Sequence, residues 1–296
     1  MTSVAVLAHS GKSLGGGLGE LRDELARQGV ADPIWYEVPK SKQAPKQAKR
    51  AVADGADLVF VWGGDGMVQR SVDALADTKA TIAILPAGTA NLLATNLGIP
   101  KDIPEAVRIG LHGARRKLDL GVVNGERFAV MAGAGFDARM IRDADGAMKD
   151  RMGRFAYIFT GAKNLRGGRV RTRIRVDGSK WFDDEASCVL VGNIGTILGG
   201  IEAFEHARPD DGRLELGVVT AEGLLQWTRA LSRTALGHAE KSPFVHTTSA
   251  KRIDVRMDEA TPYELDGGDR KKTKELEIRV EPSAIRVCVP EDGAAK

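Results

Sequence analysis

The sequence has few cysteines and no long hydrophobic run, and each shortage excludes a class of protein. Cys188 and Cys288 are its two cysteines, and they stand far apart without metal-ligand spacing. This usage favours a reduced intracellular protein with two core thiols over a secreted disulfide scaffold. The longest mostly apolar run, 186–201, is rich in glycine and shorter than the roughly 20 residues that cross a bilayer.

Strong net charge is also lacking. The 43 basic and 40 acidic residues leave a formal net charge of +3, and no motif that reads nucleic acid accompanies them. The first nine residues have no basic residue before their apolar stretch and are too short for a signal peptide. We therefore expect a cytoplasmic chain with no transmembrane segment and no nucleic-acid partner, which meets lipid only peripherally. A homodimer is compatible with the sequence.

From residue 1 to about residue 119, short apolar runs alternate with helical stretches. This alternation predicts a parallel, doubly wound α/β sheet, on which ligands bind where strands end and helices begin. The expected strand and helix pairs are 4–8 with 18–28, 34–38 with 44–54, 58–62 with 67–76, and 81–85 with 90–97.

The pattern changes near Asp119, where strand-like runs dominate. Asn124-Gly125 and Asp177-Gly178 suit the type I′ turns of β-hairpins. We predict a mainly antiparallel β-sandwich over residues 120–283, with helical insertions at 155–165 and 224–236, after an α/β domain at 1–119. The expected strands are 119–123, 127–132, 170–176, 180–182, 188–191, 214–219, 253–257, 276–280 and 285–289.

The strongest chemical motif is Gly63-Gly64-Asp65-Gly66, between a buried-strand candidate and a helix. Glycines let a polyphosphate approach the backbone, and free amides at a helix start favour anionic oxygens. A carboxylate such as Asp65 usually serves phosphates through Mg²⁺, so the four residues predict a metal-nucleotide site. The alternative is a tight β/α turn in which Asp65 caps the helix.

A second loop, Pro86 to Asn91, follows the next strand and supplies Gly88, Thr89 and Asn91 to the same crevice. Its alternative interpretation is a proline turn with Thr89 as a helix cap. Two other glycine patterns are set aside. Gly11-Lys12-Ser13 lacks the first glycine of a phosphate-binding Walker loop, and 133–138 follows a hairpin strand rather than opening a βαβ unit.

Taken in order, the motifs resemble the diacylglycerol kinase catalytic family, which includes bacterial lipid kinases and the sphingosine and ceramide kinases. Each motif alone is weak evidence, whereas the ordered set is specific and runs through most of the chain. The set is Gly63-Gly64-Asp65-Gly66, Leu85-Pro86-Ala87-Gly88-Thr89-Ala90-Asn91, Gly135-Phe136-Asp137-Ala138, Asp210-Asp211-Gly212 and Leu265-Asp266-Gly267.

The resemblance implies a kinase that uses ATP and Mg²⁺ to phosphorylate the hydroxyl of diacylglycerol or a related lipid. The product would be phosphatidic acid, which places the chain in phospholipid biosynthesis. It further implies that ATP binds in a cleft between the two domains, and that residues 284–290 return to the first domain. Residues 63–66 and Thr89 would touch the ATP phosphates, with Gly88 and Asn91 nearby.

The resemblance also implies roles in the second domain. Asp266 corresponds to the general base for the lipid hydroxyl, where a carboxylate at a strand rim can accept a proton. Without the resemblance, Asp266 reads as a β-turn aspartate before Gly267. Asp211 corresponds to a structural Mg²⁺ site completed by the main-chain oxygens of Arg208 and Arg213, and its alternative is a hairpin turn.

Three positions and one loop depart from the family pattern. Met67 replaces the usual Thr, Leu92 replaces an Asp, and Gly268 replaces the Glu of an Asp-Gly-Glu triplet. The first loop, 9–12, lacks the usual Asn-Pro pair. Loss of two acidic residues would weaken Mg²⁺ handling or base activation, although Asp269 is close enough in sequence to substitute for the missing Glu.

A basic stretch between residues 149 and 175, interleaved with aromatic residues, is a candidate membrane surface because basic residues attract anionic lipid. An ordinary solvated strand face explains its arginines equally well. Two other functions stay open. An NAD kinase-like enzyme shares the glycine loop and would phosphorylate a soluble dinucleotide, and a non-catalytic relative would bind lipid or nucleotide without phosphate transfer.

Overall fold

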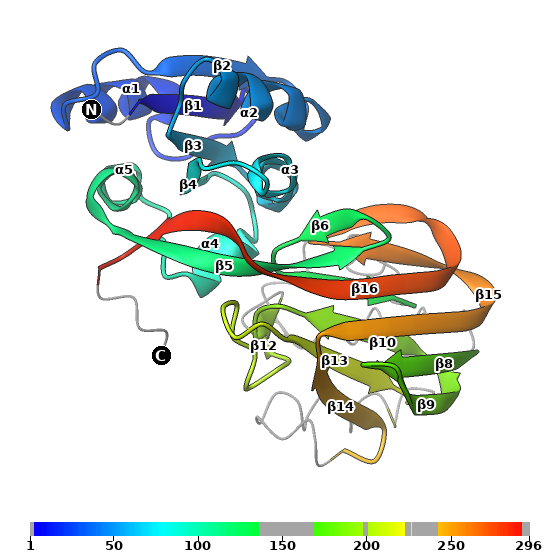
Figure 1. Cartoon of the computed structure of the whole chain (residues 1–296). Helices are drawn as coiled ribbons and strands as arrows, with labels where there is room; N and C mark the ends of the chain where they lie inside the picture. Colours follow the sequence, from blue (N-terminus) through cyan, green and yellow to red (C-terminus); the bar gives the residue numbers. More distant parts are fainter. Residues whose placement is uncertain (1–2, 136–168, 198–200, 223–225, 227–241, 292–296) are drawn as a thin grey trace, which may run out of the picture. The chain divides into compact units, whose positions relative to one another are not determined.

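The computed structural model describes residues 3–135, 169–197, 201–222, 226 and 242–291. They form two compact units, which are residues 1–120 with 281–296 (unit 1) and residues 121–280 (unit 2). The chain passes between the units within strand β5 (Ala114–Val123) and within strand β16 (Gly268–Val289). The predicted fold class is confirmed, with an N-terminal α/β domain and a C-terminal β-sandwich (Figure 1).

Unit 1 contains a parallel sheet in the order β2, β1, β3, β4 and the C-terminal part of β16. Strands β1, β3 and β4 are apolar on both faces, as in other parallel sheets that helices cover on both sides. Helix α1 packs beside α5 and helix α2 beside α3. The elements are β1 (Val4–His9), α1 (Gly17–Arg27), β2 (Ile34–Val38), the 3-10 helix η1 (Ser41–Gln43), α2 (Ala44–Ala53), β3 (Leu58–Gly63), α3 (Asp65–Leu75), β4 (Thr81–Pro86), α4 (Leu92–Asn96) and α5 (Ile103–His112).

Helix α5 has no counterpart among the predicted helices, although it carries ordinary start signals. The Asp102 carboxylate caps it by accepting a hydrogen bond from the Glu105 amide at 2.9 Å, and Pro104 stands in its first turn. The helix packs closely on the sheet, because a β-carbon on Gly110 would lie 2.2 Å from the Phe60 ring. A glycine is therefore required at this crossing.

Unit 2 is built from antiparallel strands in the order β14, β13, β10, β7, β15 and β16, with the β8–β9 hairpin beside β15 and the β5–β6 hairpin beside β16. Strand β15 pairs with β8 through its first half and with β7 through its second. The remaining strands are β6 (Glu126–Phe128), β7 (Met131–Ala134), β8 (Val170–Val176), β9 (Ser179–Ala186), β10 (Cys188–Gly192), β11 (Thr196–Ile197), β12 (Ile201–Glu202), β13 (Leu214–Val219), β14 (Val245–Ala250) and β15 (Arg252–Leu265).

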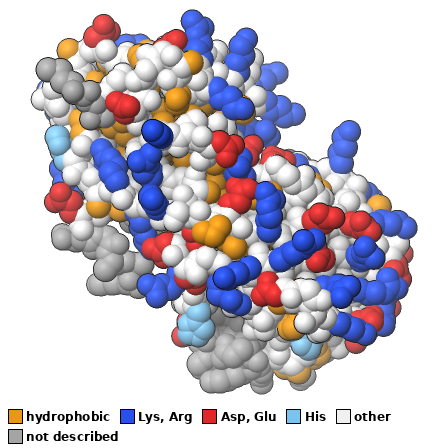
Figure 2. Space-filling model, viewed as in Figure 1, with side chains coloured by type: hydrophobic (Ala, Val, Ile, Leu, Met, Phe, Trp, Pro, Cys, Tyr) orange, Lys and Arg blue, Asp and Glu red, His pale blue; other side chains and the backbone are white. Residues whose placement is uncertain are grey.

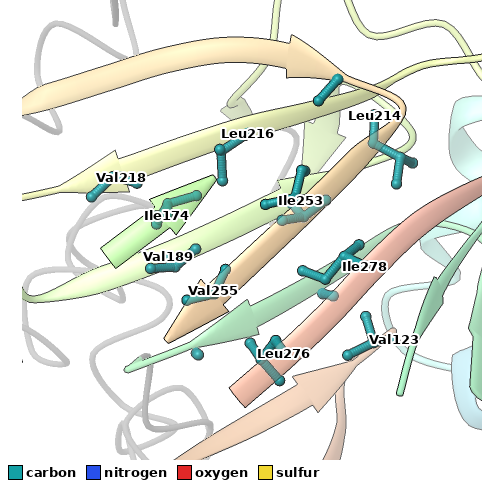
Figure 3. Packing of buried hydrophobic residues seen from close by; sticks show 14 of the residues in the cluster. Val123, Ile174, Val189, Leu214, Leu216, Val218, Ile253, Val255, Leu276 and Ile278 are labelled. Carbon is teal, nitrogen blue, oxygen red and sulfur yellow. The ribbon is translucent and has the colours of Figure 1, made fainter. Parts of the chain in front are cut away.

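Both predicted hairpin turns are confirmed. Asn124 and Gly125 connect β5 to β6, and Asp177 and Gly178 connect β8 to β9, all with positive φ angles. The apolar alternation of the strands forms one buried cluster, in which Val189, Val255 and Ile278 turn inward (Figure 3). The helices predicted at 155–165 and 224–236 lie outside the described residues, apart from Gln226.

The two cysteines are buried free thiols, as predicted. Burial raises the pKa of the Cys288 thiol to about 12 and that of the Cys188 thiol further still. No helix among the described residues has both the length and the apolar character needed to cross a bilayer.

Two glycine-to-alanine variants test the close packing of α5 on the sheet. Gly110→Ala is expected to lower the free energy of unfolding by about 1–3 kcal/mol, because the new methyl group overlaps Phe60 and Ala83. Gly19→Ala, at an exposed position of α1 with no atom near the new methyl group, is expected to raise it by up to about 1 kcal/mol. Urea unfolding measures both, and equal changes would contradict the close crossing.

Candidate functional site

Three loops of unit 1 gather at one edge of its sheet. They are residues 9–12 after β1, 63–66 after β3 and 87–91 after β4, and parallel strands place such loops at their shared carboxyl edge. The Trp62 indole nitrogen donates to the Lys12 carbonyl at 3.2 Å. A β-carbon on Gly63 would lie 3.8 Å from the His9 β-carbon. The first and second loops therefore adjoin each other.

The second and third loops touch through glycine backbone. A β-carbon on Gly88 would lie 2.3 Å from the Gly64 α-carbon, and one on Gly64 would lie 3.1 Å from the Gly88 α-carbon. Gly63 is equally confined, because its β-carbon would lie 2.5 Å from that of Met67. Gly66 differs from these three, since it is exposed and only the Ser41 hydroxyl, at 3.9 Å, lies near its missing side chain.

Asp65 joins the two loops by hydrogen bonds. Its carboxylate accepts from the backbone amides of Asn91, at 3.0 Å, and Leu92, at 2.5 Å. It does not cap its own helix, since Gly64 is the N-cap of α3 and no side chain bonds there. The sequence-based alternative was therefore wrong in detail, because Asp65 accepts amides at the start of helix α4, which follows the neighbouring strand β4.

Asn91 shapes the third loop from inside. It adopts the left-handed conformation with φ 50°, and its side chain is buried. Its Oδ1 accepts from the Gly88 amide at 2.8 Å, and its Nδ2 donates to the Gly88 carbonyl at 2.9 Å. Thr89 is exposed and caps no helix, because the N-cap of α4 is Asn91. The alternative interpretation of Thr89 as a cap is therefore wrong.

Lys101 holds the same loop from outside, and sequence reasoning missed it. Its Nζ donates to the carbonyls of Gly88 and Thr89 at 2.8 and 3.0 Å. The carbonyl and amide of one peptide point in opposite directions, so these bonds turn the amides of Thr89 and Ala90 away from Lys101. Amides presented in this way favour an anion. No local motif identifies Lys101, because it stands ten residues beyond Asn91 and before an ordinary helix cap.

In unit 2, Asp266 lies in the turn between β15 and β16 with φ 46°. It is 3% exposed, and its carboxylate accepts three backbone hydrogen bonds within the unit. Oδ2 accepts from the Ala129 amide at 2.8 Å, and Oδ1 accepts from the Val130 and Met131 amides at 2.9 Å each. The carboxylate therefore fixes the segment between β6 and β7, a role that the turn interpretation did not include.

Glu264 is a second buried carboxyl group beside Asp266, and it is only 6% exposed. It pairs across the sheet with Gly133 of β7 and with Asp269 of β16. Burial, followed by the negative charges of Asp269 and Asp266, raises its pKa to about 7. Sequence reasoning missed Glu264, because a lone glutamate in a strand gives no signal of burial.

Asp211 occupies a loop before β13, where it is exposed. Its Oδ1 accepts from the Arg213 amide at 2.9 Å, and the Arg213 guanidinium donates to Ser249. Within the described ranges, no cluster of three or more His, Cys, Asp or Glu side chains is arranged to hold a metal. A Mg²⁺ site using Asp211 and the main-chain oxygens of Arg208 and Arg213 stays a prediction.

The described part of the predicted membrane surface is largely neutralised by acidic partners. Arg169 pairs with Glu185 and Glu222, while Arg171 pairs with Asp183 at 2.6 Å. The Arg173 guanidinium pairs with Asp258 at 2.9 Å, and that of Arg175 donates to the Gly178 carbonyl. Arg169, Arg171 and Arg173 are therefore ion-paired, and residues 149–168 lie outside the described ranges.

Comparison with known proteins identifies the family. Residues 4–123 match the diacylglycerol kinase catalytic domain, and residues 130–289 match the YegS C-terminal NAD kinase beta sandwich-like domain. A diacylglycerol kinase of Bacillus subtilis is 32% identical over 232 residues, which are 76% of this chain and 75% of the relative. The chain belongs to the diacylglycerol kinase family. As a member, it is a phosphotransferase with an alcohol acceptor.

Solved structures agree with this fold. A diacylglycerol kinase from Bacillus anthracis superposes with a TM-score of 0.78 at 23% identity, covering 97% of this chain and 96% of that one. An NAD kinase from Archaeoglobus fulgidus, solved with ATP, superposes with a TM-score of 0.55 at 11% identity, covering 98% and 94%. Both likenesses concern the fold alone, which diacylglycerol kinases share with NAD kinases.

Replacement of the buried Asp266 is expected to lower the stability of the protein strongly. Asp266→Asn should lower the free energy of unfolding by about 2–4 kcal/mol, because the new amide group points a donor at backbone donors. Asp269→Asn, at an exposed carboxylate one turn away, should change it by less than about 0.5 kcal/mol. Urea unfolding compares the two. Equal stability of Asp266→Asn and the native chain would show that the three bonds do not hold the turn.

The raised pKa of Glu264 should make the free energy of unfolding depend on pH. Its folded pKa of about 7 exceeds the ordinary glutamate pKa of 4.5, so folding favours the neutral carboxyl group. The stability it contributes is complete below about pH 4.5 and is lost as pH rises through about 7. Glu264→Gln should therefore raise the free energy of unfolding by up to about 3 kcal/mol near pH 8 and hardly change it near pH 4. A pH-independent difference between the two proteins would contradict the assignment.

Proposed function

We propose that the chain transfers the γ-phosphate of ATP to the hydroxyl of diacylglycerol or a closely related lipid, giving phosphatidic acid or the corresponding phospholipid. The observation that carries the proposal is the pair of glycine loops locked together at the carboxyl edge of the parallel sheet. Gly64 and Gly88 meet through backbone, while Gly66 and Thr89 stay exposed beside them. Such a surface lets a polyphosphate contact amides without steric obstruction.

On the phosphate side, the exposed start of α3 at Gly66 and the amides beyond Gly88 would bind the ATP phosphates. Asp65 is the single carboxylate in the three loops. Each of its oxygens accepts one described amide bond, and a carboxylate has about four acceptor positions. It therefore fits a Mg²⁺ ion that keeps most of its waters. Such an ion would neutralise charge that develops on the phosphates during transfer.

On the acceptor side, Asp266 is the proposed proton acceptor for the lipid hydroxyl. Its three amide bonds hold it in one orientation, which supports positioning, although they also occupy much of its acceptor capacity. Glu264, two residues earlier at the end of β15, supplies a second carboxyl group, and its pKa of about 7 suits proton exchange at neutral pH. Loss of activity in Asp266→Asn must accordingly be compared with loss of folded protein.

Two substitutions favour a runner-up, a nucleotide-binding relative with little catalysis. Leu92 and Gly268 stand where the family resemblance implies carboxylates. Leu92 is buried and donates its amide to Asp65, so this position offers backbone rather than charge. The NAD kinase alternative is supported by the shared glycine loop and the shared fold, whereas the chain's relatives by sequence include a diacylglycerol kinase.

A single methyl group tests the phosphate site. Gly66→Ala should leave stability unchanged, since only Ser41 lies near and the position is the second residue of a helix. It should raise the KM for ATP about tenfold or more, because the methyl group would occupy space that the phosphates need. The measurement is transfer of label from γ-labelled ATP with Mg²⁺ to diacylglycerol in detergent micelles, with Gly19→Ala as the control.

The same assay separates the alternatives. Label in phosphatidic acid supports the lipid kinase, whereas label in NADP with NAD as acceptor would identify the NAD kinase-like alternative. Saturable ATP binding without transfer to any acceptor would favour the non-catalytic relative. An unchanged KM in Gly66→Ala would remove the start of α3 from the nucleotide site.

A further inference from the structure

The segment between Val38 and Asp54 carries five basic residues and no acidic residue. All five side chains are exposed. We call them the α2 basic surface, which consists of Lys40, Lys42, Lys46, Lys49 and Arg50.

Helix α2 turns three of these residues to one side. Helix α2 buries three alanines, Ala44, Ala48 and Ala51, against the rest of unit 1. Lys46, Lys49 and Arg50 have the three- and four-residue spacing that puts them on a common helix face, away from those alanines. Figure 2 shows basic side chains gathered along the edge of unit 1 where Figure 1 places α2.

The α2 basic surface begins beside the phosphate loop. Lys40 and Lys42 follow the carboxyl end of β2, which is the edge where the glycine loops lie. Between them, the Ser41 hydroxyl stands 3.9 Å from where a β-carbon of Gly66 would be. A partner resting on this surface would therefore reach the loop edge of the same unit.

The α2 basic surface differs from the basic face of β8 in its ion pairing. Within the described residues, Lys40, Lys42, Lys46 and Lys49 make no ion pair, and Arg50 reaches Asp54 only at 3.7 Å. Arg171 and Arg173 of β8, in contrast, are matched by acidic neighbours. The α2 basic surface thus offers net positive charge to an outside partner, whereas the β8 face does not.

We propose that the α2 basic surface docks the enzyme on anionic lipid bilayers. The inference rests on the proposed function, because an enzyme whose acceptor lies in a bilayer must meet that bilayer at its surface. Unpaired lysines without large exposed apolar side chains between them suit electrostatic attachment rather than insertion. The attraction falls off within a Debye length of about 8 to 10 Å, so it should weaken steeply with salt.

Vesicle sedimentation tests the proposal. The native chain should bind phosphatidylcholine vesicles that contain phosphatidylserine, and should bind pure phosphatidylcholine weakly. The double variant Lys46→Gln/Lys49→Gln should bind the anionic vesicles about 20- to 30-fold more weakly, since each basic residue contributes about fivefold. The matched control is Arg171→Gln/Arg173→Gln, which removes the same charge from the paired β8 face and should bind almost as the native chain does.

Kinase measurements keep this proposal distinct from the proposed function. With a short-chain diacylglycerol in detergent, the Lys46→Gln/Lys49→Gln variant should match the native rate, and on anionic vesicles it should lose activity in proportion to binding. If the native chain phosphorylates no diacylglycerol in detergent, the proposed function fails while the sedimentation result still stands.

Three results would overturn the docking proposal. The first is equal binding of the native chain to anionic and neutral vesicles, and the second is equal loss in the two double variants. The third is preferential, lysine-dependent binding of an RNA oligonucleotide that anionic vesicles do not displace, which would assign the surface to nucleic acid.

Discussion

The candidate site depends on the Asp65 carboxylate, which connects the loops that follow two neighbouring strands. Asp65 starts the helix after β3, yet both of its hydrogen bonds go to amides at the start of the helix after β4. With Gly64 and Gly88 in backbone contact, the two loops behave as one unit, since neither can shift without breaking a charge-assisted bond or opening a packed contact. A phosphate-binding surface gains from such rigidity because less ordering remains to be done when the ligand binds.

In unit 2, too, short polar side chains bond the backbone of separate segments. Aspartate or asparagine stands first in three Asx-Gly turns there. Asn124, Asp177 and Asp266 each take the left-handed conformation, and each side chain bonds backbone outside its own turn. Asp177 accepts from Lys251 and Arg252, as Asp266 accepts from the segment before β7. Short polar side chains at tight turns thus tie hairpins to neighbouring strands. Asp266 differs from the other two in being buried, which makes its turn the least tolerant of substitution.

Local sequence patterns predicted most of the helices and strands. Apolar periodicity and turn dipeptides depend only on residues that are close together in the chain. The strands at 34–38 and 214–219 and both Asx-Gly hairpins follow from residues that are adjacent in the chain. The partners of Asp65 and Asp266 could not be predicted in this way. They lie about 26 and 136 residues away, respectively, and a backbone amide leaves no residue signature. Lys101 and Glu264 were missed for the same reason, since a carbonyl ligand and a buried environment are set by packing.

The leucine at position 92, where the family pattern has an aspartate, has a physical explanation. An aspartate at position 92 would stand next to the carboxylate that already accepts the amide of that residue, so two negative charges would share the loop. Leu92 removes one of them and packs in the core instead. Lys101, bound to the carbonyls of the adjoining loop, adds a positive charge nearby. The loops therefore carry one carboxylate, Asp65, where the family pattern would give two, and a Mg²⁺ ion bound beside it would be held by Asp65, phosphate oxygens and water.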